Sequence, residues 1–358
     1  MRIQSFPSVS ARGETSGVHS AEVQAAYERV LAGTSVRDRY VSHGAGGRVH
    51  LLEKGSGRPV VILHGTGDPA GFFLPLLEAL DGVRVIAPDR PGIGLSDPVE
   101  LPIHGYRAAA VSWLDGLLDA LDLQTTALVG HSGGGVWALW YALARPERVT
   151  RLVLMGVPTM PGTRAPLPIR LMTTPALGAV LRRLIPPSPA SFMRLARAVG
   201  EGETIGAHPD LIDLLVAVAR DPVAQRATRT EFRAIVSPLP LLSRDGFRRH
   251  GRVRPEELGG LAMPTSVVWG ERDPLGGSAV ARAVTGLIPN ARLEVLPTGH
   301  GPWLGEPERT ARAVMGSARS SPSRGDACAY VACRPSDTST RASDATSRCS
   351  IVTSSDFS

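Results

Sequence analysis

Short apolar runs rich in β-branched residues mark the first half of the chain, a composition typical of strands that are buried on both faces. Such strands are predicted at residues 59–63, 83–87, 126–129 and 151–155. Apolar residues at helical spacing lie between these runs. They predict crossover helices at residues 71–80, 106–121 and 135–144. Strands that alternate with helices in this way predict an α/β fold built on a mostly parallel sheet.

The N-terminal part of the chain predicts a different arrangement. Residues 39–42 and 49–53 indicate an antiparallel hairpin, turned by the Gly-rich residues 44–47. Residues 21–32 place their apolar side chains on one helical face, whereas residues 1–20 are polar and predict disorder. We therefore expect residues 1–38 to form a disordered segment followed by a helix.

The alternation of strands and helices stops between residues 160 and 255. Helical patterns interrupted by proline take its place, which predicts an inserted helical region. Its apolar stretches lie at residues 167–184, 192–199 and 211–219. Because short helices are stabilised mainly by packing their apolar face, we expect most of this surface to face the main domain or to line a pocket.

Residues 316–358 are dense in Ser, Thr, Arg and Asp and poor in large apolar residues. Such low hydrophobicity cannot offset the entropy of ordering, so we expect disorder. The three cysteines, Cys328, Cys333 and Cys349, all lie here at spacings unlike a zinc-ligand pattern. We hypothesise that a change of reading frame near Gly316 produced this segment. A chain that ends at Arg319 should then keep full activity.

The formal net charge is +6, and 43% of the residues are hydrophobic, which is ordinary for a globular protein. No run approaches the roughly 20 apolar residues that span a bilayer. The N-terminus also lacks a secretory apolar region, so we expect a cytoplasmic protein. Residues 163–255 hold 15 Arg against 7 acidic residues, a surplus that either attracts anionic ligands or keeps the helices hydrated. Without aromatic interleaving or a nucleic-acid motif, these arginines do not indicate nucleic-acid binding.

The pentapeptide Gly130-His131-Ser132-Gly133-Gly134 carries the strongest chemical signal. It follows a predicted strand and opens a predicted helix, which is the setting of a Gly-x-Ser-x-Gly nucleophile elbow. The serine of such a turn is strained, and the residues two positions away have no room for a Cβ. The sequence therefore predicts Ser132 as a nucleophile at a helix N-terminus.

A serine nucleophile needs a base within hydrogen-bond reach and a carboxylate that orients the base. Of the nine histidines, His300 follows a final apolar run and lies in a Gly-rich loop. Asp273 is the predicted carboxylate, with Glu271 as the weaker alternative, because no acidic residue lies near the end of the run at Met155. The chain order Ser132, Asp273, His300 is the order in which proteins with this elbow carry the triad.

These motifs occur in the order found in the α/β-hydrolase superfamily, which the chain resembles from about Arg39 to Met315. The matching segments are residues 64–67, 88–97, 130–134, 265–273 and 292–300. The resemblance implies an α/β-hydrolase fold, an eight-stranded and mostly parallel sheet flanked by helices, with its core at residues 39–159 and 256–315. It implies a helical cap at residues 160–255 and two last strands before Asp273 and His300. It also implies an oxyanion hole formed by the backbone N–H groups of Thr66 and Gly133.

The resemblance further implies a serine hydrolase without cofactor or metal. Such an enzyme cleaves an ester-like bond of a small molecule (a carboxylic ester, lactone or thioester) through an acyl-enzyme. Phe72, Phe73, Trp137 and Trp303 are candidates for lining the substrate pocket, with plain core packing as the alternative. An acyltransferase, a carbon–carbon bond hydrolase and a cofactor-free perhydrolase would use the same triad. A ligand-binding receptor on a hydrolase scaffold is the alternative of another class, and the oligomeric state does not follow from the sequence.

Overall fold

The computed structural model describes residues 19–44, 47–237 and 243–316, in which eight strands form one sheet of order β1-β2-β4-β3-β5-β6-β7-β8. The pairs β1–β2 and β2–β4 are antiparallel, and the other neighbours are parallel. The strands are β1 (Arg37–Ser42), β2 (Arg48–Lys54), β3 (Pro59–Leu63), β4 (Arg84–Pro88), β5 (Thr126–His131), β6 (Val149–Met155), β7 (Thr265–Gly270) and β8 (Ala291–Leu296). This confirms the predicted eight-stranded, mostly parallel sheet. The predicted disordered segments lie largely outside the described residues, as do residues 45 and 46 of the predicted turn.

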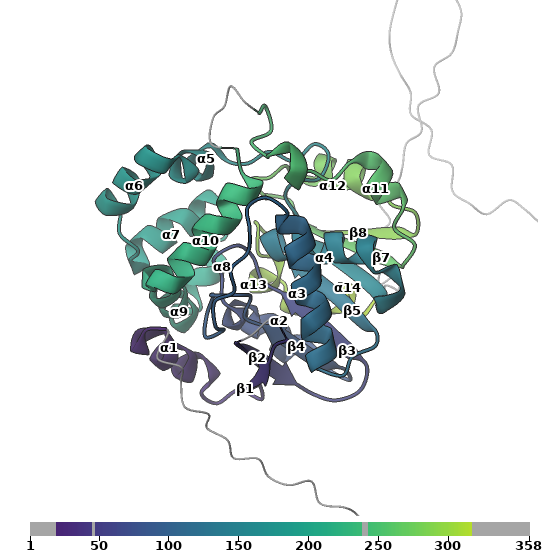
Figure 1. Ribbon diagram of the computed structural model, residues 1–358, viewed down its shortest axis with the longest axis horizontal. Coiled ribbons are helices and arrows are strands. Elements are labelled where there is room, and N and C mark those ends of the chain that lie inside the picture. Colours follow the sequence, from purple (N-terminus) through teal and green to yellow (C-terminus); the bar gives the residue numbers. More distant parts are fainter. Residues whose placement is uncertain (1–18, 45–46, 238–242, 317–358) are drawn as a thin grey trace, which may run out of the picture. The chain divides into compact units, whose positions relative to one another are not determined.

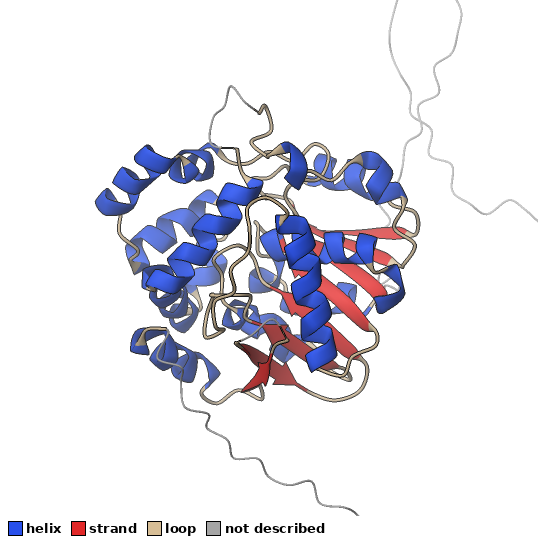
Figure 2. Ribbon diagram, in the orientation of Figure 1, coloured by secondary structure: helices blue, strands red, loops and turns tan. Residues whose placement is uncertain are grey.

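Helices cover both faces of the sheet, as Figure 2 shows. Alternate residues of one strand therefore enter two different hydrophobic clusters: Val61 and Leu63 of β3 face one side, whereas Val60 and Ile62 face the other. A strand buried on both faces needs a continuous apolar run rather than an alternating one. This is why the runs in the sequence located the strands.

The three predicted crossover helices are present, with two local differences. The helices outside the insertion are α1 (Ala21–Leu31), η1 (Ala70–Phe73), α2 (Leu74–Ala79), α3 (Tyr106–Ala120), α4 (Ser132–Ala144), η2 (Pro146–Arg148), α12 (Ser278–Thr285), α13 (Pro302–Gly305) and α14 (Pro307–Met315). The helix predicted at residues 71–80 is divided into η1 and α2, with Pro75 in the first turn of α2. Helix α4 begins at Ser132, three residues before the predicted start, because the glycines of the elbow already form its first turn.

A group of helices without strands connects β6 to β7 and lies beside the sheet (Figure 1). We call its helices α5 to α10 the helical insertion. Together with the connection to β7, the elements are α5 (Leu167–Thr173), α6 (Pro175–Leu184), α7 (Pro189–Ala198), α8 (Gly202–Gly206), α9 (Pro209–Arg220), α10 (Pro222–Ile235), η4 (Arg249–Gly251) and α11 (Pro255–Gly259). None of the helices within the described ranges is both long enough and apolar enough to cross a bilayer.

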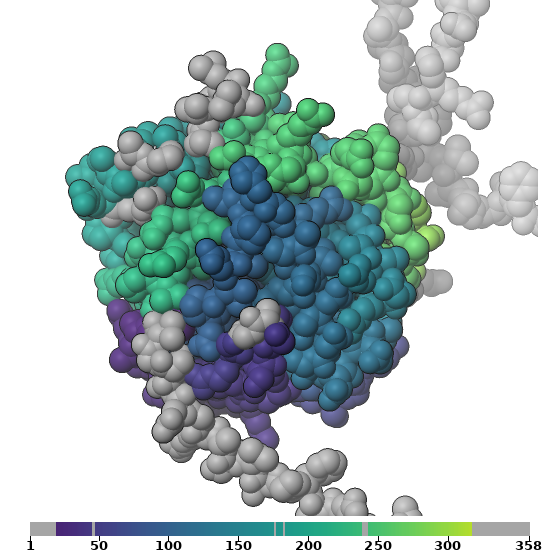
Figure 3. Space-filling model, in the orientation of Figure 1, coloured from purple at the N-terminus to yellow at the C-terminus, as the bar shows by residue number. Residues whose placement is uncertain are grey.

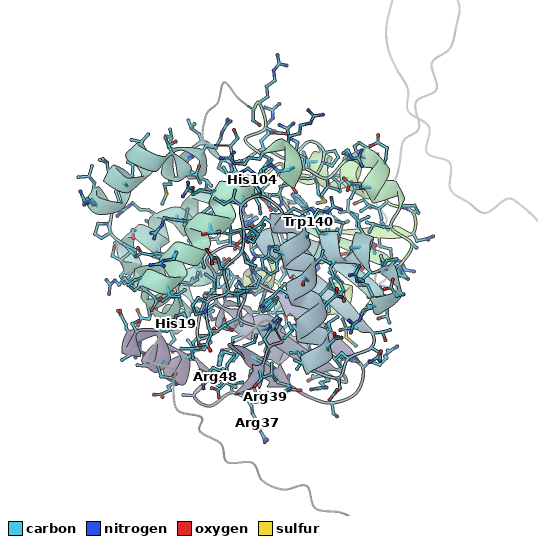
Figure 4. The ribbon with its side chains drawn as sticks, viewed as in Figure 1. His19, Arg37, Arg39, Arg48, His104 and Trp140 are labelled. Carbon is cyan, nitrogen blue, oxygen red and sulfur yellow. The ribbon has the colours of Figure 1, made fainter. Side chains whose placement is uncertain are left out.

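The N-terminal segment fastens the helical insertion to the sheet domain. The His19 ring contacts the Asp221 carboxylate at 3.3 Å and the Ser96 carbonyl oxygen at 2.8 Å, and Figure 4 labels His19 beside α1. Asp221 also accepts hydrogen bonds from the backbone N–H groups of Val223 and Ala224, which caps the N-terminus of α10. One carboxylate therefore joins the chain's N-terminal part to the start of α10.

The expected burial of the apolar stretches in the insertion is confirmed for residues 211–219 but not for residues 167–184. In α9, Leu211, Leu214 and Val218 are buried. In contrast, large apolar side chains of residues 167–184 are exposed, namely Leu167, Met172, Leu177, Val180 and Leu184. Helix α9 packs between α1, α10 and η1, whereas α5 and α6 pack mainly on each other at the outer edge of the insertion (Figure 1). The expectation that most of the apolar surface of the three stretches faces the main domain or lines a pocket is therefore not met at residues 167–184.

Candidate active site

The three residues predicted as a triad follow three strands at the same edge of the sheet. Ser132 follows β5, Asp273 follows β7 and His300 follows β8. Because β5 to β8 are parallel neighbours, their carboxyl ends open onto one edge. Ligand sites of open α/β sheets lie at this edge.

The turn between β5 and α4 has the geometry of a nucleophile elbow. Ser132 has a φ of 49°, a left-handed conformation that a residue with a side chain adopts only at a cost. A Cβ at Gly130 would lie 2.5 Å from the Cα of Gly135. A Cβ at Gly134 would overlap the carbonyl oxygens of Leu63 and His64. Both glycines are thus required by close backbone approach, as predicted from the pentapeptide.

His300 and Asp273 form a hydrogen-bonded pair. His300 Nδ1 lies 2.9 Å from Asp273 Oδ2, and the Leu275 backbone N–H donates to the other carboxylate oxygen at 2.8 Å. The Asp273 side chain is fully buried, whereas the side chain of Glu271, the weaker alternative, is exposed. A carboxylate at Nδ1 fixes the ring so that Nε2 is free to accept a proton.

His300 also contacts the residue that precedes Ser132. The His131 Nε2–H group donates to the His300 carbonyl oxygen at 3.0 Å, and the centroids of the two rings are 4.6 Å apart. Burial lowers the pKa of His131 well below its usual value, so His131 is neutral. The Ser132 hydroxyl has no hydrogen-bond partner among the described residues. Catalytic hydrogen bonds are often long without substrate and tighten when it binds.

The two predicted oxyanion donors lie next to each other. A Cβ built on Gly133 would be 3.2 Å from the Thr66 backbone nitrogen and would overlap the Thr66 hydroxyl oxygen. It would also be 2.7 Å from Glu231 Oε1. Gly133 therefore leaves a space beside the predicted nucleophile, and the Thr66 and Glu231 side chains occupy that space.

Glu231 belongs to α10 and forms a buried ion pair with Arg90, which follows β4. Arg90 Nη1 and Nη2 donate to the two carboxylate oxygens at 2.8 and 3.0 Å. Nη2 also donates to the Gly65 carbonyl oxygen at 2.8 Å, and the guanidinium lies 4.8 Å from the ring centroid of Trp137. Glu231 is 5% exposed and Arg90 is 2% exposed. This bidentate pair connects the helical insertion to the loop that carries Thr66.

Asp68, two residues after Thr66, adds a second acidic group. Burial raises the pKa of Asp68 to about 6, an effect that His300 and Arg90 oppose and Glu231 reinforces. Burial also disfavours the charged form of His300, but the Asp273 carboxylate, with smaller contributions from Asp68 and Glu201, outweighs it and raises the His300 pKa. The site is therefore rich in negative charge.

The helical insertion also holds the loop of the predicted base. The His300 N–H donates to the Val199 carbonyl oxygen at 3.1 Å, and the Gly301 N–H donates to Glu201 Oε1 at 2.8 Å. Glu201 is buried, and this burial raises its pKa although hydrogen bonds from Thr204 and Gly301 favour the carboxylate. Residues 199–201 thus fix the backbone on both sides of the imidazole.

The aromatic residues predicted to line a pocket lie mainly in the core. Phe73, Trp137 and Trp303 are buried within the two hydrophobic clusters, and Phe72 packs against one of them. Trp303 donates its indole N–H to the Phe72 carbonyl oxygen at 2.8 Å. Their packing accounts for their position, and their contact with a substrate stays a prediction.

The sequence analysis did not identify the four charged residues Asp68, Arg90, Glu201 and Glu231. Arg90 lies inside the motif at residues 88–97, and Asp68 directly follows the motif at residues 64–67, so their closeness to Thr66 and to the end of a strand was a usable signal. Glu201 and Glu231 lie in the helical insertion, where no motif marks them. Within the described part of the chain, no group of three or more His, Cys, Asp or Glu side chains is arranged to hold a metal ion.

Comparison with known proteins agrees with this architecture. The family model of the alpha/beta hydrolase fold matches residues 58–307. A 2-hydroxy-6-oxononadienedioate/2-hydroxy-6-oxononatrienedioate hydrolase from Cupriavidus pinatubonensis is 32% identical, over 77% of this chain and 90% of the relative. A 2-hydroxymuconate semialdehyde hydrolase from Pseudomonas putida is 31% identical, over 75% of this chain and 90% of the relative.

Solved structures share the fold. The carboxylesterase CesB from Bacillus subtilis superposes with a TM-score of 0.63 at 21% identity, over 82% of this chain and 96% of that protein. The meta-cleavage product hydrolase CumD from Pseudomonas fluorescens gives 0.62 at 24% identity, over 78% and 96%. At such identities a structural likeness supports the fold alone, and the family model supplies the assignment. The chain belongs to the alpha/beta hydrolase fold family.

Proposed function

We propose that the chain hydrolyses a bond next to a carbonyl group through an acyl-enzyme on Ser132. The strained Ser132 turn beside the hydrogen-bonded His300–Asp273 pair is the observation that supports this proposal. His300 Nε2 takes the Ser132 proton, and Asp273 stabilises the imidazolium. The backbone N–H groups of Gly133 and Thr66 bind the oxyanion.

A carbon–carbon bond of an oxo-dienoic acid is the substrate bond that the relatives favour, because the two described above are hydrolases of such compounds. In this reaction Ser132 attacks the oxo carbon. The 2-hydroxy-diene must first tautomerise to its 2-oxo form, so that when the carbon–carbon bond breaks its electron pair is delocalised onto the 2-oxo group. The His300 imidazolium then returns its proton to the resulting dienolate. Water finally releases the acid from Ser132 with His300 as the base.

Hydrolysis of a neutral carboxylic ester is the second candidate, and the charges of the site favour it. Asp68 and Glu231 lie beside the predicted oxyanion donors, and Arg90 is already paired with Glu231. A substrate carboxylate in this region would be repelled by both acids unless it displaced Glu231 from Arg90. A neutral ester meets no such repulsion.

Two measurements test this proposal. A fluorophosphonate probe should label the native protein and should not label Ser132→Ala; equal labelling of the two proteins would contradict the role of Ser132. Turnover of 2-hydroxymuconate semialdehyde should then be compared with turnover of p-nitrophenyl acetate and butyrate. A higher kcat/KM for the semialdehyde supports carbon–carbon bond hydrolysis, whereas a preference for the esters supports the second candidate.

A further inference from the structure

The exposed large hydrophobic side chains are concentrated in one part of the molecule. Every such side chain in the described residues lies between Leu167 and Leu195, on or next to α5, α6 and α7. A concentration of exposed apolar side chains on a globular protein marks an interaction site. The outer helices of the insertion are therefore candidates for contact with another surface.

Helix α6 presents the most coherent group. Leu177, Val180 and Leu184 follow at intervals of three and four residues and so share one side of the helix; we call them the α6 face. They are 41%, 52% and 73% exposed, and Ile185, directly after the helix, is 54% exposed. Figure 3 shows this teal segment at the outer edge of the molecule. Helix α6 is thus amphipathic with its apolar side turned outwards.

The charged residues of the chain segment around α6 have a single sign. Residues 161–200 contain six Arg and no Asp or Glu. Arg183, Arg194 and Arg197 are exposed, and none of the three forms an ion pair with a described residue. Arg170 is buried and donates to the Ser243 carbonyl oxygen, so it does not belong to this surface. The exposed guanidinium groups are available to anions.

We propose that the α6 face, together with Ile185, is an interaction surface for an anionic phospholipid bilayer. An amphipathic helix with basic residues lies in the bilayer interface with its apolar side among the acyl chains, while each Arg gains attraction to anionic headgroups. A second copy of the chain fits less well. A symmetric contact through the α6 face would bring the same positive charges of both copies together.

The proposed surface is connected to the candidate active site. Helix α7 ends at Ala198, and the next residues, 199–201, hold the His300 loop. Along the chain, a single helix, α7, thus separates the proposed bilayer contact on α6 from the segment that holds the predicted base. Such a position suits amphiphilic substrates that concentrate at a membrane surface.

Co-sedimentation of the full chain with vesicles tests the proposal. The protein should sediment with vesicles that contain phosphatidylglycerol and remain mostly in solution with vesicles of phosphatidylcholine alone. Leu184→Glu should lower binding by at least about tenfold, because it puts a charge among the acyl chains. Ala179→Glu is the matched control, since it adds the same charge to the same helix at an exposed position outside the α6 face.

Three results would overturn the proposal. The first is that the protein binds neither kind of vesicle. The second is that Leu184→Glu and Ala179→Glu lose binding equally. The third is that the protein forms a dimer without lipid and that Leu184→Glu dissociates this dimer. Thermal unfolding and fluorophosphonate labelling of Leu184→Glu should match the native protein. Labelling also separates the two proposals, because a protein that is labelled but binds no vesicles refutes the surface and leaves the hydrolase intact.

Discussion

The edge of the sheet and the helical insertion contribute different things to the same site. Ser132, Asp273 and His300 all follow strands, and the backbone of those strands sets their spacing. The insertion contributes Glu231 beside Gly133 and the 199–201 segment beside His300. The comparison indicates that the sheet carries the proposed reacting groups, whereas the insertion contributes charge beside them and holds one loop in place.

Removal of a reacting group is the most severe test of this division. Ser132→Ala and His300→Ala should each lower kcat by about 10⁴-fold, because neither leaves a group that can replace the nucleophile or the base. Steady-state turnover of the preferred substrate is the measurement, with circular dichroism as the control for folding. Substantial activity in either variant would place the chemistry elsewhere.

Loss of the buried ion pair tests how firmly the insertion is held to the sheet domain. Glu231→Gln should lower the free energy of unfolding by about 3–5 kcal/mol, because it leaves Arg90 buried without a counter-charge. Urea unfolding measures this change. Glu22→Gln is the matched control: the Arg220–Glu22 pair is about half exposed, and its loss should change stability by at most about 1 kcal/mol. Equal effects of the two variants would show that the Arg90–Glu231 pair does not hold the insertion.

The smallest expected effect concerns the charge near the base. Glu201→Gln keeps an oxygen that can accept the Gly301 N–H but removes a negative charge that helps to raise the pKa of His300. The His300 pKa should then fall, so the neutral base persists to lower pH. The acidic limb of the kcat/KM profile should shift to lower pH, by less than one unit.

The other groups that face His300 provide a control for this shift. Asp273, Asp68 and the neutral His131 lie around the same ring. Asp68→Asn should move the acidic limb in the same direction as Glu201→Gln, and by more, because Asp68 contributes more to the raised pKa. An unchanged limb in Glu201→Gln would indicate that Glu201 acts only through the shape of the loop.

The strands of the sheet and the elbow at Ser132 could be predicted well from the sequence. Strands buried on both faces require continuous apolar runs, so β3 and β5 were visible in the residues themselves. The elbow was visible because a left-handed Ser132 needs glycines around it. In both cases the structural constraint applies to residues that are close together in the sequence. A local sequence pattern is therefore sufficient to predict the structure.

The packing of the helical insertion was much less predictable from the sequence. Apolar spacing identified amphipathic stretches in α6 and in α9, but it cannot tell which partner each face meets. The packing of α9 against α1 depends on a segment nearly two hundred residues away, and α6 has no such partner in the described chain. Glu231 could not be found in the same way, because its position beside Gly133 is set by how α10 lies on the sheet domain.

The presence of glycine, which has no side chain, at position 133 has one further consequence. Part of the space beside Ser132 is filled by Glu231 of the helical insertion, so a single exchange on α10 would alter the polarity next to the proposed nucleophile without changing any strand or the elbow itself. We therefore expect exchanges at position 231 to change substrate preference while the three proposed catalytic side chains stay in place.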